Sequence, residues 1–219
     1  MEGIEQAQKL RGYIEGENLS FTEQKEYLDI LKGDNKQSSV IVTSNLRRAI
    51  STVVLSLWSR LQRTKEKILI LSSLQEFSRN VDTRALAEPK SIPELGRISE
   101  ALSDEGFKFE GDVVLDPEYN NGNKTMSFYG IKRLQAFNAW VFSRPEDTII
   151  VGGHSLWFRS YFQTYIPHAK QNLSCCTKKI VNSGAVAFSL SQSKGKNSDG
   201  EFMYRIDPDT VTTVSGGYM

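Results

Sequence analysis

The stretch Thr43-Ser44-Asn45-Leu46-Arg47-Arg48-Ala49-Ile50 follows a short apolar run, and the stretch Thr148-Ile149-Ile150-Val151-Gly152-Gly153-His154-Ser155 contains another. Each pattern predicts a buried strand that leads into a helix. Each also places a side chain able to bind an anion, Arg48 or His154, just past the carboxyl end of the strand. In open parallel sheets, ligands bind beyond those ends. Arg48 and His154 are therefore the first candidates for a functional site.

Strand and helix patterns alternate along the rest of the chain. This alternation predicts an α/β fold, a three-layer α/β/α sandwich around a mostly parallel sheet. Ser20 and Glu23 resemble a capping box that opens a second helix. A polar turn at 193–200 is predicted to join the last two strands. The expected strands are 40–42, 68–71, 148–152, 186–190 and 202–206, and the clearest helices are 3–15, 45–62, 127–143 and 155–165.

Composition excludes several classes of protein. The 27 basic and 26 acidic residues nearly balance, whereas nucleic-acid binders usually carry a basic excess. No apolar run reaches the roughly 20 residues that cross a bilayer, and the first 20 residues lack the apolar core of a signal peptide. The expected compartment is therefore cytoplasmic, with no membrane and no nucleic acid as partner. The adjacent Cys175 and Cys176 are expected to be free thiols.

The length of 219 residues suits one large domain, which we expect to span 1–219. Within it, residues about 77–125 form an irregular, loop-rich insertion that contains three prolines and only short helical patterns. Long insertions of this kind inside compact domains are usually functional. We therefore expect this insertion to shape the pocket next to the strand ends.

The two candidate residues have a physical rationale of their own. Arg48 lies in the first turn of a predicted helix, where the helix dipole and free N–H groups already favour an anion. Its guanidinium can grip a phosphate with two parallel hydrogen bonds, which lysine cannot do. His154 follows Gly152 and Gly153, which allow close approach of a ligand to the backbone. An oxyanion is the ligand that fits both residues.

The sequence resembles the histidine phosphatase superfamily, also called phosphoglycerate mutase-like. Ser44, Leu46, Arg48 and Ala49 match the family's Ser-x-Leu-x-Arg-Ala segment, and His154 stands where the family has its second catalytic histidine. The run Gly3–Leu10 looks like the family's first helix, so the resemblance covers nearly the whole chain. One departure is Ser155, because many relatives have glycine after the histidine.

The resemblance implies roles for particular residues. Arg48 would bind the phosphoryl group, and His154 would donate to its oxygens as charge develops. Glu76 would be the acid that protonates the leaving group. The sequence leaves rival acids and further cations open. The rival acids are Asp82 and Glu88, and the further cations are Arg79 and Arg84. Three residues would have supporting roles: Ser44, Arg159 and Asn182.

The family's first strand and its Arg-His-Gly motif have no counterpart, because the chain begins at the predicted first helix. The only histidines are His154 and His168, and neither lies in that motif. The family's reaction passes through a covalent phosphohistidine on the missing residue. The resemblance therefore implies an N-terminally incomplete domain whose first strand is missing from between the strands at 148–152 and 186–190. Unpaired strand edges there would favour self-association.

Three functions follow from the resemblance. The first is a histidine phosphatase-type phosphomonoesterase, present as an N-terminally truncated chain without its nucleophile. The second is a non-catalytic pseudophosphatase that binds phospholigands or a protein partner, and the third is a phosphoglycerate mutase-type isomerase. The expected substrate is a phosphorylated small molecule or a phosphoprotein. No cofactor is implied, and no metal-ligand pattern is found.

Overall fold

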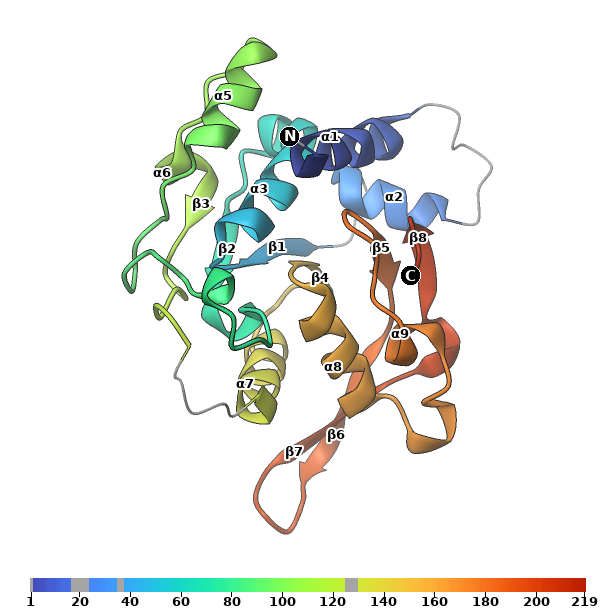
Figure 1. Cartoon of the computed structure of the whole chain (residues 1–219). Coiled ribbons are helices and arrows are strands. Elements are labelled where there is room, and N and C mark those ends of the chain that lie inside the picture. Colours follow the sequence, from blue (N-terminus) through green and yellow to red (C-terminus); the bar gives the residue numbers. More distant parts are fainter. Residues whose placement is uncertain (1, 17–23, 35–37, 125–129) are drawn as a thin grey trace.

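The computed structural model describes residues 2–16, 24–34, 38–124 and 130–219. It is an α/β fold whose central sheet has four parallel strands flanked by helices (Figure 1). The predicted three-layer α/β/α arrangement is thereby confirmed. The strand order is β3–β2–β1–β4, with β1 at Ser39–Ser44, β2 at Ile68–Leu71, β3 at Leu115–Asp116 and β4 at Thr148–Gly152.

Strand β1 lies inside the sheet, and its side chains face both layers. Ile41 packs into one core, whereas Val40 and Val42 pack into the other. This alternation is the period of two expected of a strand covered on both faces. β1 pairs in parallel with both neighbours, with Val42 opposite Leu69 of β2 and Val151 of β4.

The helices form two layers on the sheet. One core joins β1 and β2 to α1, α3, α4 and α5, and the other joins them to α7 and α8. Figure 1 shows α1 and α3 on one side of the strands and α7 and α8 on the other. The bounds are α1 Glu2–Glu15, α2 Lys25–Lys32, α3 Arg47–Ser56, α4 Trp58–Thr64, α5 Gly96–Asp104, α6 Gly111–Val114, α7 Gly130–Val141, α8 Ser155–Tyr165 and α9 Ser174–Thr177.

The single helix predicted at 45–62 is wrong in one respect, because the chain forms two helices there. α3 ends at Ser56 and α4 begins at Trp58, with Leu57 between them in a non-helical conformation (φ −108°, ψ 16°). Leu57 and Trp58 are both buried. The apolar stripe therefore continues across the break, which is why periodicity alone did not reveal it.

The region 77–125 is less irregular than the sequence indicated. Besides the 3₁₀ helix η3 (Val81–Thr83), it contains α5 and α6, and it adds β3 to the edge of the sheet. β3 has only two residues, so it is too short to leave a periodic signal. The insertion is thus tied to the sheet at one edge.

The C-terminal strands differ from the prediction. The predicted strand 186–190 is divided into β5 (Ala185–Ala187) and β6 (Leu190–Lys196). β6 pairs with β7 (Phe202–Ile206), whereas β5 pairs with β8 (Thr212–Ser215), a strand that the sequence reading missed. The turn between β6 and β7 begins at Asn197, so much of the expected turn at 193–200 is strand.

Other sequence predictions match the structure closely. β2, β4 and α8 have the bounds expected of them, and α7 begins at Gly130 at the edge of the described residues. The proposed capping box of Ser20 and Glu23 lies outside the described residues. Within the described ranges, the other 3₁₀ helices are η2 Ser72–Leu74, η4 His168–Lys170 and η5 Pro208–Thr210. Among the described residues, no helix combines the length and apolar character needed to span a bilayer.

Candidate functional site

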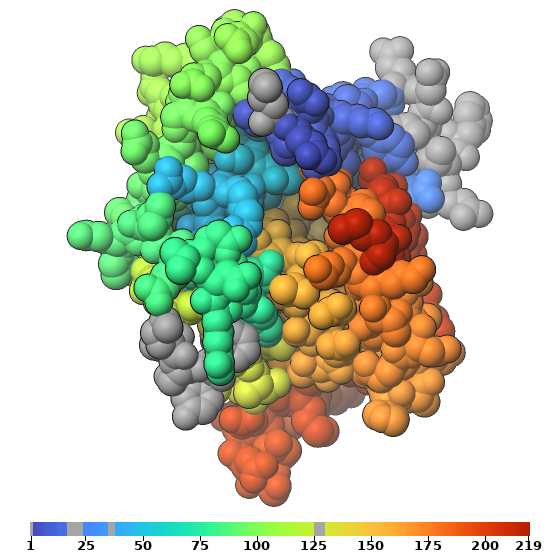
Figure 2. All heavy atoms as spheres, in the orientation of Figure 1, coloured from blue at the N-terminus to red at the C-terminus, as the bar shows by residue number. Residues whose placement is uncertain are grey.

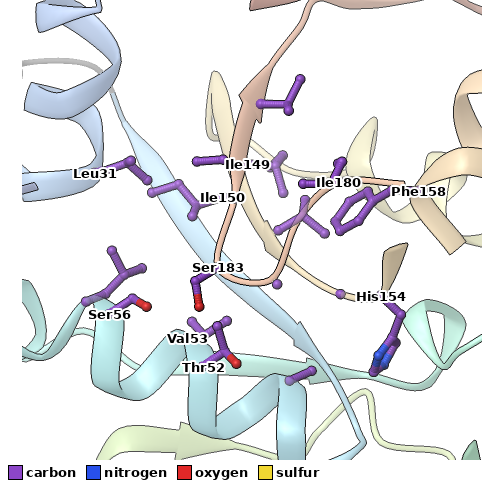
Figure 3. Close-up of a pocket in the computed structure, with 18 of the residues that line it drawn as sticks. Leu31, Thr52, Val53, Ser56, Ile149, Ile150, His154, Phe158, Ile180 and Ser183 are labelled. Atoms are coloured by element: carbon purple, nitrogen blue, oxygen red, sulfur yellow. The ribbon is translucent and has the colours of Figure 1, made fainter. Parts of the chain in front are cut away.

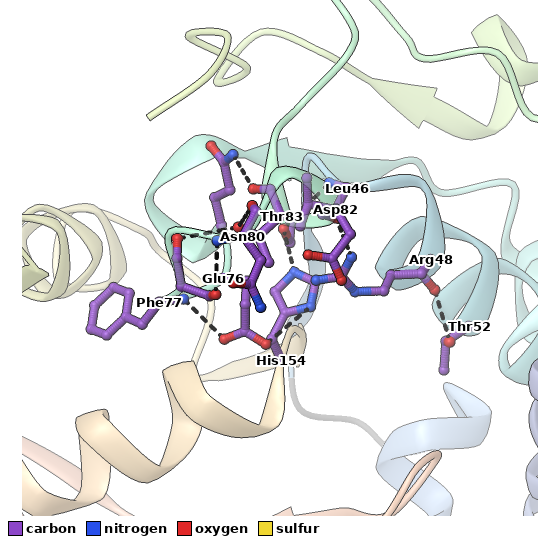
Figure 4. Close-up of polar contacts among 12 residues, drawn as sticks. Leu46, Arg48, Thr52, Glu76, Phe77, Asn80, Asp82, Thr83 and His154 are labelled. Carbon is purple, nitrogen blue, oxygen red and sulfur yellow. Dashed lines mark hydrogen bonds and ion pairs between the residues drawn. The ribbon is translucent and has the colours of Figure 1, made fainter. Parts of the chain in front are cut away.

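The carboxyl end of β1 supplies one side of the site. Ser44, the last residue of β1, is fully buried, and its Oγ accepts a hydrogen bond from the Leu46 backbone N–H at 3.3 Å. This bond turns the chain into α3, which begins at Arg47. Arg48 is exposed in the first turn, and its Nη1 donates to the backbone carbonyl of Asp82 at 2.7 Å (Figure 4). The guanidinium is therefore held against the 3₁₀ helix η3.

The carboxyl end of β4 supplies the other side. Gly152 packs so closely on α3 that a Cβ there would overlap the Val53 side chain. His154 follows in extended conformation (φ −128°, ψ 143°) at the N-cap of α8 and is buried. Its Nε2 lies 2.8 Å from Ser44 Oγ, which joins the two strand ends directly.

Glu76 is the acid that approaches this pair. It follows β2 and η2, is 8% exposed, and accepts a hydrogen bond from the Phe77 N–H through Oε1 at 2.9 Å. Its Oε2 lies 4.0 Å from His154 Nδ1. The rival acids lie differently: Asp82 offers its backbone carbonyl to Arg48, and both Asp82 and Glu88 are exposed. Glu76 is thus the acid in contact with the histidine.

Burial and nearby cations keep His154 neutral. Desolvation, followed by the charges of Arg48, Lys124 and Arg133, lowers the His154 pKa from 6.5 to about 3. Burial raises the pKa of Glu76, against the opposing effect of the Phe77 N–H and Arg48. At 4.0 Å, Glu76 and His154 could form an ion pair only if His154 were protonated. Its lowered pKa keeps His154 unprotonated near neutral pH. Near neutral pH, Glu76 therefore faces a polar but uncharged imidazole.

Two further cations, which the sequence analysis missed, lie beside Glu76. Lys124 Nζ donates to the carbonyls of Glu76 and Ser78, both at 2.6 Å, and to Thr83 Oγ1 at 3.0 Å. Burial lowers its pKa to about 8. Arg133, from α7, donates to the Gln75 carbonyl at 2.5 Å, and burial lowers its pKa to about 10. Neither residue lies in a motif, so only the fold brings them to the site.

A buried asparagine fixes the loop beside the site. Asn45 Nδ2 donates to Gly122 O at 2.9 Å, to Ser72 Oγ at 3.1 Å and to Asn120 Oδ1 at 3.2 Å. Asn120 is fully buried, and Asn45 is 1% exposed. This Asn45 clamp connects the ends of β1 and β2 to the 120–122 loop. Because Lys124 follows that loop, the clamp also helps to position Lys124.

A large cavity of about 1420 Å³ opens beside these residues. Arg48, Glu76 and His154 line one part of it, and Asn182 lines another with its neighbours. Arg159 is half-buried one turn into α8 and does not line this cavity, although the sequence placed it among the supporting residues. Figure 3 shows His154 at one end of the drawn group and Leu31 at the opposite end.

The groups gathered at this end of the sheet are of kinds that can bind an oxyanion. Two helix N-termini, a fixed guanidinium and a neutral imidazole converge on one edge of the sheet. In the described part of the chain, no cluster of three His, Cys, Asp or Glu residues could hold a metal ion. Cys175 and Cys176 are buried free thiols, as expected, and His168 is exposed in η4.

Comparisons with protein-family models, with curated proteins and with solved structures found no match to this chain.

Proposed function

We propose that this chain is the body of a histidine phosphatase-type phosphomonoesterase, N-terminally truncated and lacking its nucleophile. One observation carries the proposal: Ser44 and His154, at the ends of adjacent strands, are joined at 2.8 Å while Arg48 is held on the neighbouring helix turn. A phosphoryl group placed there meets a guanidinium, a helix N-terminus and an imidazole together.

Each residue has a role in this proposal. Arg48 binds two phosphoryl oxygens, and its hydrogen bond to the Asp82 carbonyl fixes the direction of its guanidinium. His154 donates to the same group once the bound dianion raises its pKa from about 3. Glu76, whose pKa burial raises, is suited to deliver a proton to the leaving oxygen. Ser44 orients the imidazole, and Asn182 lines the approach.

The nucleophile is proposed to lie on a segment outside residues 1–219. Within those residues the two histidines are His154, which this proposal uses for phosphoryl binding, and His168, which is exposed in η4. Phosphoryl transfer to a histidine forms a P–N bond as the P–O bond to the leaving group breaks. The protonated carboxyl of Glu76 would give its proton to that oxygen, and water would then attack the phosphorus and break the P–N bond, which releases phosphate and the free histidine.

The test compares two forms of the protein. The intact mass of the protein purified from its source cells shows whether it is heavier than the 24.7 kDa of this chain. We expect a longer form to hydrolyse an aryl phosphate and to form an acid-labile phosphoenzyme, whereas recombinant 1–219 binds inorganic phosphate without turnover. If recombinant 1–219 hydrolyses the ester and loses that activity in His154→Ala, the truncation proposal is wrong.

A second candidate is a pseudophosphatase that binds phosphorylated ligands. It is favoured by the observation that, in the part of the chain that the structure describes, His154 is the one histidine at the site. The two candidates share phosphate binding, so a phosphate-dependent rise in melting temperature supports either. A source protein whose mass matches 1–219, and which binds phosphate but does not turn over, would favour this second function.

A further inference from the structure

The loop that begins at Glu76 is wrapped around one ammonium group. Lys124 is half-buried, and its Nζ donates to the carbonyls of Glu76 and Ser78, both at 2.6 Å, and to Thr83 Oγ1 at 3.0 Å. An ammonium group has three N–H donors. These three oxygens, which we call the Lys124 cage, therefore occupy all of them.

A lysine beside an anion site often binds the anion itself, but the geometry of Lys124 does not suit that role. Its three donors already have protein partners, and it does not line the cavity to which Arg48, Glu76 and His154 belong. A phosphate would have to break a bond of the Lys124 cage to reach Nζ. Lys124 is thus better placed to hold the loop than to bind a ligand.

The Lys124 cage acts on the Glu76 carboxyl group through a single peptide plane. The carbonyl of Glu76 and the N–H of Phe77 belong to one peptide group, and every peptide bond in the described ranges is trans. In a trans peptide these two groups point in opposite directions within one plane. The carbonyl accepts from Lys124, and the N–H donates to Glu76 Oε1 at 2.9 Å (Figure 4). Lys124 therefore fixes the plane that directs this N–H at the carboxyl group.

The same cage reaches Arg48 through η3. Thr83, whose Oγ1 accepts from Lys124, is the last residue of η3 and is 3% exposed. The carbonyl of the preceding residue, Asp82, accepts the bond from Arg48 Nη1 at 2.7 Å. In Figure 2 the teal atoms of this loop lie on the visible surface beside the light-blue atoms of α3. One ammonium group therefore links the acid to the guanidinium.

The backbone beside Lys124 is anchored independently of its side chain. Gln75 Oε1 accepts from the Lys124 backbone N–H at 2.8 Å, and Gln75 Nε2 donates to Asn123 Oδ1 and to the Thr83 carbonyl, both at 2.7 Å. Gln75 is fully buried. These bonds remain when the ammonium group is removed, so replacement of Lys124 is a local change.

The charge of Lys124 acts on the acid in the same sense as its geometry. Burial raises the pKa of Glu76, and the Phe77 N–H, Arg48 and Lys124 all oppose this rise. Removal of the ammonium group would delete one opposing charge and would release the peptide plane that carries the opposing N–H. Both changes would raise the pKa of Glu76 further.

We propose that Lys124 is a positioning residue whose ammonium group couples the direction of the Glu76 carboxyl group to the placement of the Arg48 guanidinium. This inference rests on the proposed function, because it assigns a role at the same site. Lys124 neither binds the phosphoryl group nor transfers a proton. It holds the acid and the arginine in one arrangement, so that a phosphate ester bound at Arg48 meets a correctly directed carboxyl group.

The test compares Lys124→Met with wild type in recombinant 1–219. We expect the NMR titration of the Glu76 carboxyl carbon to move to higher pH, and the Arg48 side-chain N–H signals to move towards those of a freely rotating arginine. Titration calorimetry should show affinity for inorganic phosphate reduced about 5-fold. Lys67→Met is the matched control, because Lys67 also donates to a backbone carbonyl but precedes β2, at the opposite end of the sheet. It should change none of the three measurements.

A double-mutant cycle with Arg48→Ala separates positioning from direct attraction of the anion. If Lys124 acts through Arg48, Lys124→Met should cause almost no further loss of phosphate affinity in the Arg48→Ala background. An equal loss in both backgrounds would overturn the proposal. Thr83→Val is a second variant that keeps the ammonium group but removes its link to η3. It should alter the Arg48 signals and leave the Glu76 titration close to that of wild type.

Two further outcomes would overturn the proposal. One is an unchanged Glu76 titration in a Lys124→Met protein whose β1 and β2 amide signals show that it is folded. The other is unchanged Arg48 signals in Thr83→Val, which decides the question even if Lys124→Met does not fold. Failure of the phosphatase proposal has a different signature. If wild-type 1–219 bound no phosphate, that proposal would fail, whereas the Glu76 and Arg48 signals would still decide the role of Lys124.

Discussion

The Nε2 atom of His154 lies 2.8 Å from the Oγ atom of Ser44, although the two residues are 110 positions apart. Ser44 ends β1, and His154 follows β4, so the contact reports the side-by-side pairing of these strands. Ser44 Oγ also accepts the Leu46 N–H at 3.3 Å, so one hydroxyl contacts both the turn into α3 and the imidazole. The other ring nitrogen of His154, Nδ1, faces Glu76 with Oε2 at 4.0 Å.

Arg48→Ala should weaken binding of inorganic phosphate. Loss of a charge-assisted contact costs about 1.5–3 kcal/mol, which corresponds to roughly 10-fold to 100-fold in affinity. The matched control is Arg47→Ala, because Arg47 is exposed in the same helix turn. Titration calorimetry at low ionic strength measures both. Equal losses for the two variants would show that only general charge matters.

His154 should make the stability depend on pH. The unfolded chain takes up a proton near pH 6.5, whereas the folded chain does so only near its lowered pKa of about 3. The free energy of unfolding should therefore fall as pH decreases from 6.5 towards 3, by up to about 1.4 kcal/mol per pH unit.

The control for this pH effect is His154→Gln, measured by urea unfolding from pH 7 to pH 4. Glu76 acts in the opposite direction, because its raised pKa reduces stability as pH increases above 4.5. The difference between wild type and His154→Gln isolates the histidine. Parallel pH profiles for the two proteins would contradict the prediction.

Lys124→Met should loosen the loop that follows Glu76. The ammonium group bonds to Glu76, Ser78 and Thr83, so its removal leaves three oxygens without this donor. We expect a loss of about 1–3 kcal/mol in the free energy of unfolding and faster proteolysis within 78–86.

Lys67→Met is the matched control for the loop experiment. Lys67 is exposed, and its Nζ donates to the Asp112 carbonyl at 2.8 Å. Its replacement should change stability by less than about 0.5 kcal/mol, as for most surface substitutions. If both lysine variants had the same stability and the same cleavage pattern, Lys124 would not hold the loop.

Gly152→Ala should destabilise the protein because the added methyl group would overlap Val53. Overpacking of this kind costs about 1–3 kcal/mol. The penalty should shrink in a Val53→Ala background, where the space is open. Thermal unfolding of the double-mutant cycle measures the coupling. Gly12→Ala is the control, since nothing lies within 4 Å of a Cβ there; equal effects in both backgrounds would reject the steric explanation.

The sequence was sufficient to predict the parts of the fold that depend on local pattern. Strong apolar runs located β2 and β4, and the pattern at 155–165 located α8. It was not sufficient for β8, whose four residues Thr-Thr-Val-Ser carry one apolar side chain, or for the break at Leu57. Short strands and buried helix breaks depend on tertiary packing, which a periodic pattern does not record.

The candidate site shows the same division. Arg48 and His154 could be located because each follows an apolar strand, and parallel strands bring such positions together. The sequence could not choose between Glu76, Asp82 and Glu88, because the choice depends on which loop residue turns inward. Lys124 was missed because two of its three partners are backbone carbonyls, which have no sequence signature.

The Asn45 clamp has a consequence for the order of folding. It joins Asn45 to Ser72, Asn120 and Gly122, across sequence separations of 27 to 77 residues. Loop-closure entropy opposes such distant contacts until much of the chain is in place. We therefore expect the helices and β1–β2 to assemble first and the clamp to close late. A chain caught before that step would have most of its core, but its 120–124 loop would not yet hold Lys124 beside Glu76.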